Sequence, residues 1–306
     1  MYELIAVTGP TASGKTAVAC ALAARLQSAV ISADSRQVYR GMDIGTGKDL
    51  DEYVVDGQHV PYFLIDICDA GTHYNIFQYQ HDFHKVFSDL KAKNIVPVLC
   101  GGSGLYIEAV LRGYRLPEVP ENAELRKSLG SKSLEELTKL LSSYGNMHNT
   151  TDVDSVQRAI RAIEIAEFSQ KNQLQSNEFQ PVNALIIGID TERTLRRAKI
   201  TQRLKQRLEN GMIEEIKNML TNGLAPADLI YYGLEYKYVT QFVTGKISYS
   251  EMFSQLEIAI HQFAKRQMTW FRGMERRGLK INWIDAQIAL NEKVDIIISK
   301  FKNQIG

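Results

Sequence analysis

The 306-residue chain has few of the features typical of secreted, zinc-binding or membrane proteins. It has only three cysteines, Cys20, Cys68 and Cys100, which are far apart and form no C-x-x-C pair. The sequence therefore predicts neither a disulfide framework nor a zinc site. No apolar run approaches the length of a membrane-spanning helix. The first residues carry no basic segment followed by an apolar run, so we expect no signal peptide, no membrane association and a cytoplasmic location.

The chain also lacks an excess of charge of either sign. Its formal net charge is +1, from 36 Lys and Arg against 35 Asp and Glu. A polyanionic partner would therefore have to be bound by a local cluster of basic residues. One such cluster is the basic stripe, whose members recur at helical spacing: Arg196, Lys199, Arg203 and Arg207. This pattern is compatible with contact to nucleic acid or phosphate, and equally with a solvated helix face.

The start of the chain, in contrast, carries a complete phosphate-binding motif. Residues 9–16, the phosphate loop, read G-P-T-A-S-G-K-T and fit the pattern G-x-x-x-x-G-K-[ST]. The apolar stretch 2–8 predicts a strand before the loop and the stretch 17–26 predicts a helix after it, which is the context that the motif requires.

A loop of this kind binds a di- or polyphosphate through its backbone N–H groups and the positive end of the following helix. Lys15 would contact the outer phosphate, and the Thr16 hydroxyl would ligate Mg²⁺. The residues expected to bind the diphosphate are Gly9, Thr11, Ala12, Ser13, Gly14, Lys15 and Thr16.

Short apolar runs alternate with segments of helical period through most of the chain. Helical period is clear at 77–90 and 104–111, for example. Such alternation predicts an α/β fold with a doubly wound, mostly parallel sheet. After the first strand, buried strands are predicted at 29–32, 63–67, 95–99, 184–188 and 281–284.

One stretch departs from this alternation, because residues 117–181 show helical patterns and no convincing strand. We interpret it as a helical insertion domain that faces a large ligand. The sequence thus predicts three parts. Residues 1–116 form the first part of the phosphate-loop core, residues 117–181 form the insertion, and residues 182–306 complete the core with a helical segment and the last strand.

Ligands of doubly wound sheets bind beyond the carboxyl ends of the strands. Asp34 follows the strand at 29–32 and is placed to accept a proton, although capping of a helix or binding of a magnesium-bound water would also explain it. Ser103 lies among three glycines after another strand, and its hydroxyl could donate to a developing oxyanion or cap the next helix. Lys265 and Arg272, seven residues apart, share a helix face that could reach a phosphate or be merely solvated.

Taken together, these segments resemble the tRNA dimethylallyltransferases, also called tRNA isopentenyltransferases. The match follows the family's order from residue 4 to about 285. Its most specific part is D-S-x-Q-x-Y at 34–39 combined with G-M-D-I-G-T at 41–46. No C-terminal zinc finger is present, as is typical of the bacterial type. Further matching segments are 64–66, 101–106, 157–164, 236–237 and 265–272.

The resemblance implies transfer of a dimethylallyl group from dimethylallyl diphosphate to the exocyclic amino group of the adenosine 3′-adjacent to the anticodon of tRNA, with release of diphosphate. By position, Asp34 would take the proton from the amino nitrogen. Ser103, where the family usually has threonine, would hydrogen-bond the bridging oxygen of the leaving group. Charge on the diphosphate would be offset by Lys15, by Thr16 with Mg²⁺, and by Lys237, Lys265 and Arg266.

The implied partners are the anticodon stem-loop of tRNA and dimethylallyl diphosphate, bound by a monomer. The target base would have to leave the stack, at a reduced cost because the anticodon loop is already single-stranded. The residues that fall where the family contacts tRNA are Asp34, Ser35, Arg36, Gln37, Ser103, Arg126, Gln157, Arg158, Ala159, Ile160 and Arg161.

Three other functions fit part of the same sequence. An isopentenyltransferase acting on a free adenine nucleotide would use the same donor, but the helical insertion and the basic stripe favour a large polyanionic acceptor. A small-molecule kinase shares the phosphate loop and the sheet, but it would consume the terminal phosphate of ATP. A non-catalytic nucleotide-binding regulator would have no reason to match a transferase at its strand ends.

Overall fold

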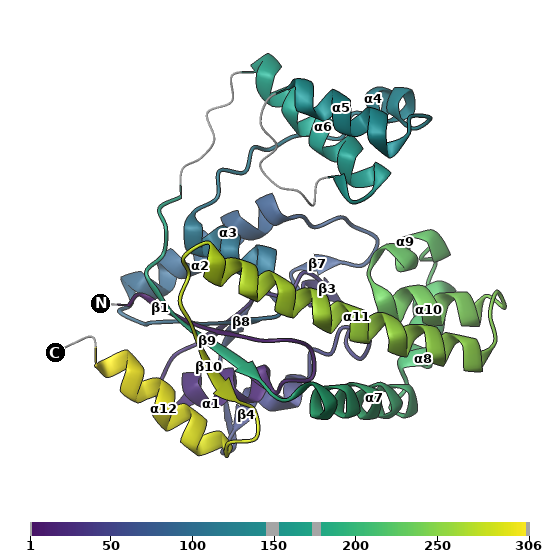
Figure 1. Ribbon diagram of the computed structural model, residues 1–306. Coiled ribbons are helices and arrows are strands. Elements are labelled where there is room, and N and C mark those ends of the chain that lie inside the picture. The colour runs from purple at the N-terminus through teal and green to yellow at the C-terminus, as the bar shows by residue number, and fades with distance from the viewer. Residues whose placement is uncertain (1, 145–152, 173–178, 304–306) are drawn as a thin grey trace. The chain divides into compact units, whose positions relative to one another are not determined.

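The computed structural model describes residues 2–144, 153–172 and 179–303, and its centre is a six-stranded sheet (Figure 1). Every pairing in this sheet is parallel, and the strand order is β10-β9-β1-β8-β2-β6. The predicted doubly wound α/β fold is therefore confirmed. The strands are β1 (Leu4–Thr8), β2 (Val30–Ser32), β6 (Tyr62–Phe63), β8 (Val98–Gly101), β9 (Ala184–Asp190) and β10 (Ile281–Asp285).

Each face of the sheet has its own hydrophobic core, because successive side chains of a strand point to opposite faces. On β1, Leu4 and Ala6 belong to one core, and Ile5 and Val7 belong to the other. Helices α1 (Lys15–Arg25) and α12 (Leu290–Lys302) pack on the Ile5 side. Helices α2 (Ile76–Ala92), α3 (Gly104–Arg112) and α11 (Tyr249–Arg276) pack on the Leu4 side (Figure 1). The sheet is thus covered on both faces, as parallel sheets are.

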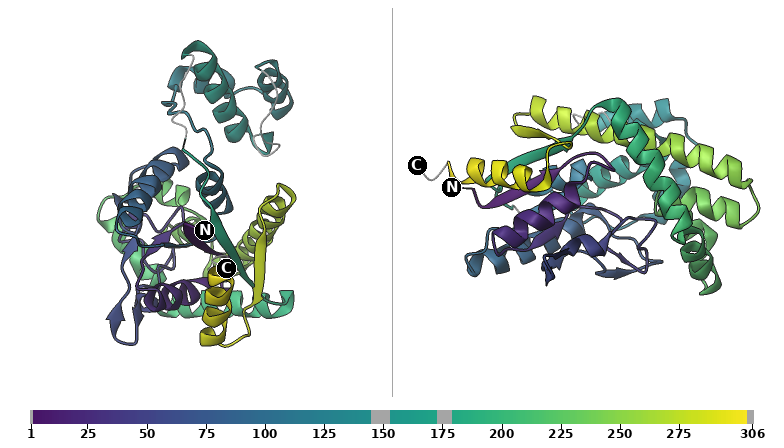
Figure 2. Two further views of the ribbon diagram at one scale, coloured as in Figure 1. Left: turned by 90° about the vertical axis from the view of Figure 1, so that its left-hand side faces the viewer. Right: turned by 90° about the horizontal axis from the view of Figure 1, so that it is seen from below.

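Four further helices pack with the long helix α11. They are α7 (Arg193–Glu209), α8 (Met212–Thr221), α9 (Pro226–Tyr231) and α10 (Leu234–Val243). Apolar residues such as Leu204 of α7, Ile216 of α8 and Val239 of α10 are buried in the same core as Leu4. Helix α11 contacts α7 and α10 as well as α3, and the right-hand view of Figure 2 shows this part of the molecule from below.

The strand predicted at 63–67 is largely wrong. Within this range only Phe63 lies in a strand, and the backbone turns at Leu64 (φ 61°) and Asp66 (φ 56°). The left-handed turn lets the Asp66 N–H donate to the Gln37 carbonyl at 3.1 Å. Two small sheets lie nearby: β3 (Tyr39–Arg40) with β7 (Cys68–Asp69), and β4 (Val54–Val55) with β5 (Gln58–His59), the latter after a 3₁₀ helix at Leu50–Tyr53.

Residues 114–179 form a separate compact unit. Its helices are α4 (Ala123–Leu129), α5 (Leu134–Ser143) and α6 (Val156–Asn172). They enclose a small core of Leu129, Leu137, Leu141, Ala159, Ile160 and Ile163. Residues 145–152 and 173–178 of the predicted insertion lie outside the described residues, and its role as a tRNA-facing domain stays a prediction. In the described part of the chain, no helix is long and apolar enough to cross a membrane.

Candidate active site

Three loops meet where three neighbouring strands end. The phosphate loop follows β1, residues 102–104 follow β8, and residues 33–37 follow β2. In the parallel register Thr8 lies beside Gly101, and Ser32 lies beside Cys100. The loops therefore leave the sheet at the same edge, which is where the sequence predicted the chemistry.

Gln267 of α11 ties two of these loops together. Its side-chain oxygen accepts a hydrogen bond from the Thr11 N–H at 2.9 Å, and its side-chain nitrogen donates to the Gly102 carbonyl at 3.0 Å. Gln267 is buried, so both bonds are shielded from water. Gln267 lies in the segment 265–272 that carries the resemblance, but its local sequence predicts no role for it. The sequence feature that could have indicated a role for Gln267 is its position, because it is an amide side chain on the apolar face of a long helix.

Two polar side chains of the phosphate loop have no hydrogen-bond or ion-pair partner within the described part of the chain. Lys15 makes no hydrogen bond or ion pair with any other side chain in the described part of the chain, and burial lowers the pKa of its ammonium. The Ser13 hydroxyl is buried and has no hydrogen-bond partner among the described residues. Buried polar groups without partners are costly. A bound anion would satisfy both groups, and the N-terminus of α1 would favour its charge.

Asp34 and Ser103 lie beside each other at this edge. The Ser103 hydroxyl oxygen accepts a hydrogen bond from the Ser35 N–H at 3.2 Å, and the Ser103 N–H donates to the Ala33 carbonyl at 3.3 Å. The Asp34 carboxylate accepts from the Arg36 N–H at 2.9 Å. Although Ser103 precedes α3, its side chain does not cap that helix. A Cβ on Gly101 would overlap the Ala33 carbonyl, so only glycine permits this close approach of the two loops.

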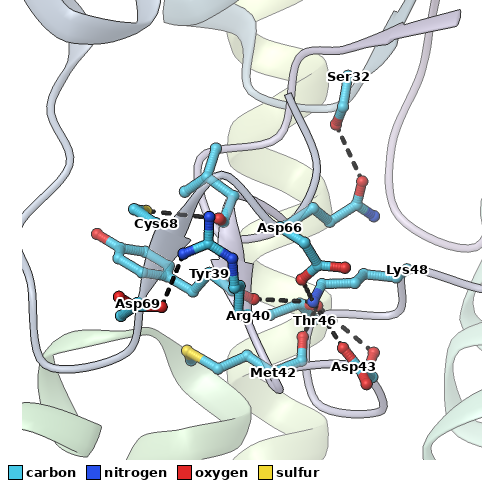
Figure 3. Close-up of polar contacts among 12 residues, drawn as sticks. Ser32, Tyr39, Arg40, Met42, Asp43, Thr46, Lys48, Asp66, Cys68 and Asp69 are labelled. Atoms are coloured by element: carbon cyan, nitrogen blue, oxygen red, sulfur yellow. Dashed lines mark hydrogen bonds and ion pairs between the residues drawn. The ribbon is translucent and has the colours of Figure 1, made fainter. Parts of the chain in front are cut away.

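Gln37 and Lys48 hold the segment after Asp34 in place, and Figure 3 shows the contacts of Lys48. The Ser32 hydroxyl donates to the Gln37 side-chain oxygen at 3.0 Å, and the Gln37 side-chain nitrogen donates to the Gly47 carbonyl at 3.0 Å. Lys48 is buried and donates to the Tyr39 carbonyl at 2.8 Å and to the carboxylates of Asp43 and Asp66. The side chains of Gln37 and Lys48 thus brace this segment from within. The Gln37 amide, predicted to contact tRNA, is used in internal hydrogen bonds.

Glu215 of α8 binds a row of backbone N–H groups in the same segment. Its carboxylate accepts hydrogen bonds from the N–H groups of Asp43, Ile44 and Gly45 at 2.9, 2.7 and 3.0 Å. The Tyr236 hydroxyl of α10 also donates to it, at 2.6 Å. Three successive N–H groups that converge on one anion form a nest. The sequence does not predict this contact, because nothing in the local pattern of α8 distinguishes Glu215 from its neighbours.

Three members of the basic stripe are half-buried, whereas Lys199 is exposed. Arg196 pairs with Asp190 at 2.5 Å, Arg203 pairs with Asp49, and Arg207 lies 3.9 Å from Glu235. Arg203 and Arg207 line a small pocket with Thr11 and Ala12 of the phosphate loop. Arg196, Arg203 and Arg207 are thus engaged with acidic side chains, and Arg203 and Arg207 lie beside the phosphate loop.

The cations predicted from the resemblance lie away from these contacts. Lys265 and Arg266 are exposed on α11, and Arg266 lies over the Phe263 ring, 6.0 Å from its centroid. The Lys237 ammonium lies 5.0 Å from the centroid of the Tyr238 ring. In the described part of the chain, no hydrogen bond or ion pair joins these three side chains to the phosphate loop. Their contact with a diphosphate stays a prediction.

In the unit of residues 114–179, the predicted tRNA contacts divide into two groups. Ala159 and Ile160 are buried in its core, so a contact with RNA at these positions would have to involve the backbone, and it stays a prediction. Gln157 and Arg158 are exposed, and Arg158 pairs with Asp154 at 3.2 Å.

Arg126 and Arg161 in the same unit converge on the buried carboxylate of Glu164. Arg126 donates to both Glu164 oxygens, at 3.1 and 2.9 Å, and Arg161 donates to the same carboxylate and to the Val119 carbonyl. Burial by itself would raise the pKa of Glu164, but these bonds and one from the Asn122 N–H outweigh it and lower the pKa. Both arginines are thus held in the unit's own structure.

Comparison with known proteins identifies close relatives. Residues 37–274 match the model of a family described as IPP transferase. The chain is 61% identical to tRNA dimethylallyltransferase 2 of Bacteroides fragilis, covering 98% of each chain. It is 59% identical to tRNA dimethylallyltransferase 1 of Parabacteroides distasonis, covering 99% of each.

Solved structures agree with these sequence matches. The full-length tRNA isopentenylpyrophosphate transferase of Bacillus halodurans superposes with a TM-score of 0.72 at 29% identity, covering 99% of this chain and 96% of that one. A eukaryotic dimethylallyltransferase acting on tRNA superposes with a TM-score of 0.77 at 19% identity, covering 99% and 80%. At that identity the second match shows a shared fold.

Proposed function

This chain belongs to the IPP transferase family, and from that premise we propose that it transfers a dimethylallyl group from dimethylallyl diphosphate to tRNA. The chain is a prenyltransferase enzyme. The acceptor is the exocyclic amino group of the adenosine 3′-adjacent to the anticodon, and diphosphate is released. The observation that carries the proposal is the arrangement of Asp34 and Ser103 at one sheet edge, beside a phosphate loop whose Lys15 has no partner among the described residues.

In the proposed reaction, the phosphate loop binds the leaving diphosphate. The bond between the allylic carbon and the bridging oxygen breaks, and a bond forms between that carbon and the adenosine nitrogen. Lys15 and the N–H groups of the loop stabilise the charge on the departing diphosphate. Ser103 donates to the bridging oxygen, and the Asp34 carboxylate takes the proton from the amino nitrogen. An allylic carbon can carry much positive charge, so the enzyme needs no strong nucleophile.

The residues of the phosphate loop are suited to a magnesium cofactor. Mg²⁺ at phosphate sites is held by one or two protein oxygens together with phosphate oxygens and water. Thr16 offers such a hydroxyl at the start of α1, and the described residues contain no cluster of three acidic, histidine or cysteine side chains that would hold the ion alone. Thr16 would therefore ligate Mg²⁺ together with the diphosphate. When bound, the ion supplies positive charge against the leaving group.

The partially buried arginines beside the loop support a diphosphate ligand. Arg203 and Arg207 line the pocket that borders Thr11 and Ala12, and each faces an acidic side chain. Their charges are held close to where a diphosphate would lie, without being fully exposed to screening by water. This supports the phosphate loop as a binding site for the donor.

The alternative functions are not favoured. The relatives at 59% and 61% identity are named for transfer to tRNA, and they match this chain over nearly its full length. A free-nucleotide acceptor would not require the compact unit at residues 114–179. The monomeric state and the cytoplasmic location stay predictions.

One experiment tests the acceptor, the donor and the cofactor together. The protein is incubated with labelled dimethylallyl diphosphate, Mg²⁺ and either unmodified tRNA or AMP, and the nucleosides are analysed. We expect label in the adenosine next to the anticodon, none in AMP, and loss of labelling when the metal is chelated. Labelled AMP with unlabelled tRNA would instead identify a free-nucleotide transferase, and consumption of ATP without prenyl transfer would identify a kinase.

A further inference from the structure

An exposed aromatic cluster lies next to Asp34 and has no part in the chemistry above. Tyr231, the last residue of α9, is 44% exposed. The Arg36 guanidinium lies over its ring, 5.1 Å from the centroid, and the His73 ring meets it edge-on at 4.4 Å. Arg36 is tied to Asp34, whose carboxylate accepts its backbone N–H. Tyr231, Arg36 and His73, the aromatic cluster, therefore lie close to the proposed catalytic base.

The cluster stands on a rigid support. The neighbouring Tyr232 is buried, and its hydroxyl accepts from the Gly71 N–H at 2.6 Å and donates to the Thr72 carbonyl at 2.9 Å. Its ring also packs on Tyr39 with centroids 4.5 Å apart. These contacts fix the loop that carries His73 against α9. A surface ordered in advance loses little conformational entropy when a ligand binds.

The chemistry of the cluster fits an unstacked nucleobase. Single-stranded RNA is bound by aromatic rings and guanidinium planes on which its bases stack, and the cation adds attraction to the polyanion. An apolar peptide would gain nothing from the Arg36 charge. A single-stranded acceptor that brings its target base to Asp34 would also bring a neighbouring nucleotide close to Arg36.

We infer that the aromatic cluster is a stacking platform for a nucleobase adjacent to the target adenosine. The inference rests on the proposed function, because it requires an RNA acceptor whose target base reaches Asp34. It adds to that function a recognition site built from α9 and the loop at 71–74, which lie far from Asp34 in sequence. The platform would hold the flanking base while the target base is extruded.

The test measures binding of a labelled anticodon stem-loop to the full-length protein by fluorescence anisotropy. Loss of one stacked base weakens binding about 5- to 150-fold, so we expect Tyr231→Ala to raise Kd within that range. Tyr231→Phe keeps the ring and should bind within about twofold of the wild type. The matched control is Tyr249→Ala, which removes a tyrosine that is 50% exposed at the start of α11.

A second arm identifies the base. Stem-loops are made with an abasic nucleotide on either side of the target adenosine. If one of these bases stacks on the platform, its removal should weaken wild-type binding, and Tyr231→Ala should then add little, because the two changes remove the same contact. The KM for dimethylallyl diphosphate should stay unchanged in Tyr231→Ala.

Three results would overturn the platform: a Kd for Tyr231→Ala equal to that of Tyr249→Ala, equal losses in Tyr231→Phe and Tyr231→Ala, or fully additive effects with both abasic RNAs. Failure of the proposed function looks different. In that case the wild-type protein itself would fail to prenylate the stem-loop.

Discussion

Removal of the Glu215 carboxylate should destabilise the protein and disorder the segment after Asp34. Glu215→Ala leaves three backbone N–H groups and the Tyr236 hydroxyl without their acceptor. Hydrogen bonds to a charged group contribute roughly 1.5–3 kcal/mol each. Asp43 is exposed, so water can replace the Glu215 carboxylate as the acceptor of the Asp43 N–H. Tyr236 is buried, so its hydroxyl would stay without an acceptor. Counting the bonds of Gly45 and Tyr236 alone, we expect a loss of about 3–6 kcal/mol.

Glu215→Gln tests the contribution of the negative charge, because glutamine has nearly the same shape as glutamate but is neutral. A glutamine retains one acceptor oxygen, and its NH₂ group faces two N–H or O–H donors where the second oxygen was. We therefore expect about half the loss of Glu215→Ala. We expect kcat to fall as well. The segment held by Glu215 includes Gly47, whose carbonyl accepts a hydrogen bond from the Gln37 side chain. Movement of this segment would therefore be passed through Gln37 to the nearby Asp34. A displacement of about 1 Å at a reacting group can cost about 100-fold in rate.

The assay is urea unfolding of the full chain, combined with kcat and KM for both substrates. The neighbouring Glu214 provides the control, since its carboxylate is exposed and pairs with Lys217 at 2.8 Å. Glu214→Ala should change stability by less than about 1 kcal/mol. Equal losses for Glu214→Ala and Glu215→Ala would refute the role assigned to the nest.

Three further predictions concern charge. Asp34→Asn should lower kcat about 100- to 10,000-fold, as expected for loss of a general base, with binding of dimethylallyl diphosphate nearly unchanged; turnover close to wild type would exclude Asp34 as the base. Lys15→Ala should raise the Kd for dimethylallyl diphosphate at least about tenfold, as expected when a charge-assisted contact is lost, and calorimetry showing normal affinity would contradict the phosphate-loop site. Because the pKa of Glu164 is lowered in the folded protein, its contribution to stability is present above the ordinary carboxyl pKa and is lost as pH falls through the lowered value. Glu164→Gln should therefore reduce hydrogen-exchange protection in residues 114–144 and 153–172 near neutral pH by an amount equivalent to about 3 kcal/mol, and this difference from wild type should disappear in acid; a difference that is independent of pH would show that the charge of Glu164 is not responsible.

Errors in the sequence analysis arose where distant contacts override local pattern. The run at 63–67 has the apolar composition of a buried strand, yet it turns at Leu64 and Asp66. The turn at Asp66 brings its carboxylate to the buried Lys48, and burial of an unpaired ammonium would cost more than the few ladder bonds lost. Position in a motif assigned Ala159 and Ile160 to tRNA contact, but it did not show that the packing of α6 places their side chains in a core.

The sequence by itself determined the parts of the protein that depend on neighbours along the chain. The phosphate loop is contiguous, and the alternation of strands and helices places Asp34 and Ser103 at one sheet edge by the rules of parallel sheets. Only the tertiary structure decided which helices face those loops. Gln267 contacts Thr11 across 256 residues, and Glu215 contacts Ile44 across 171. Tyr231 reaches Arg36 over a similarly long separation. Helical periodicity tells which face of a helix is buried, but it does not tell against what, because that depends on how the whole chain packs.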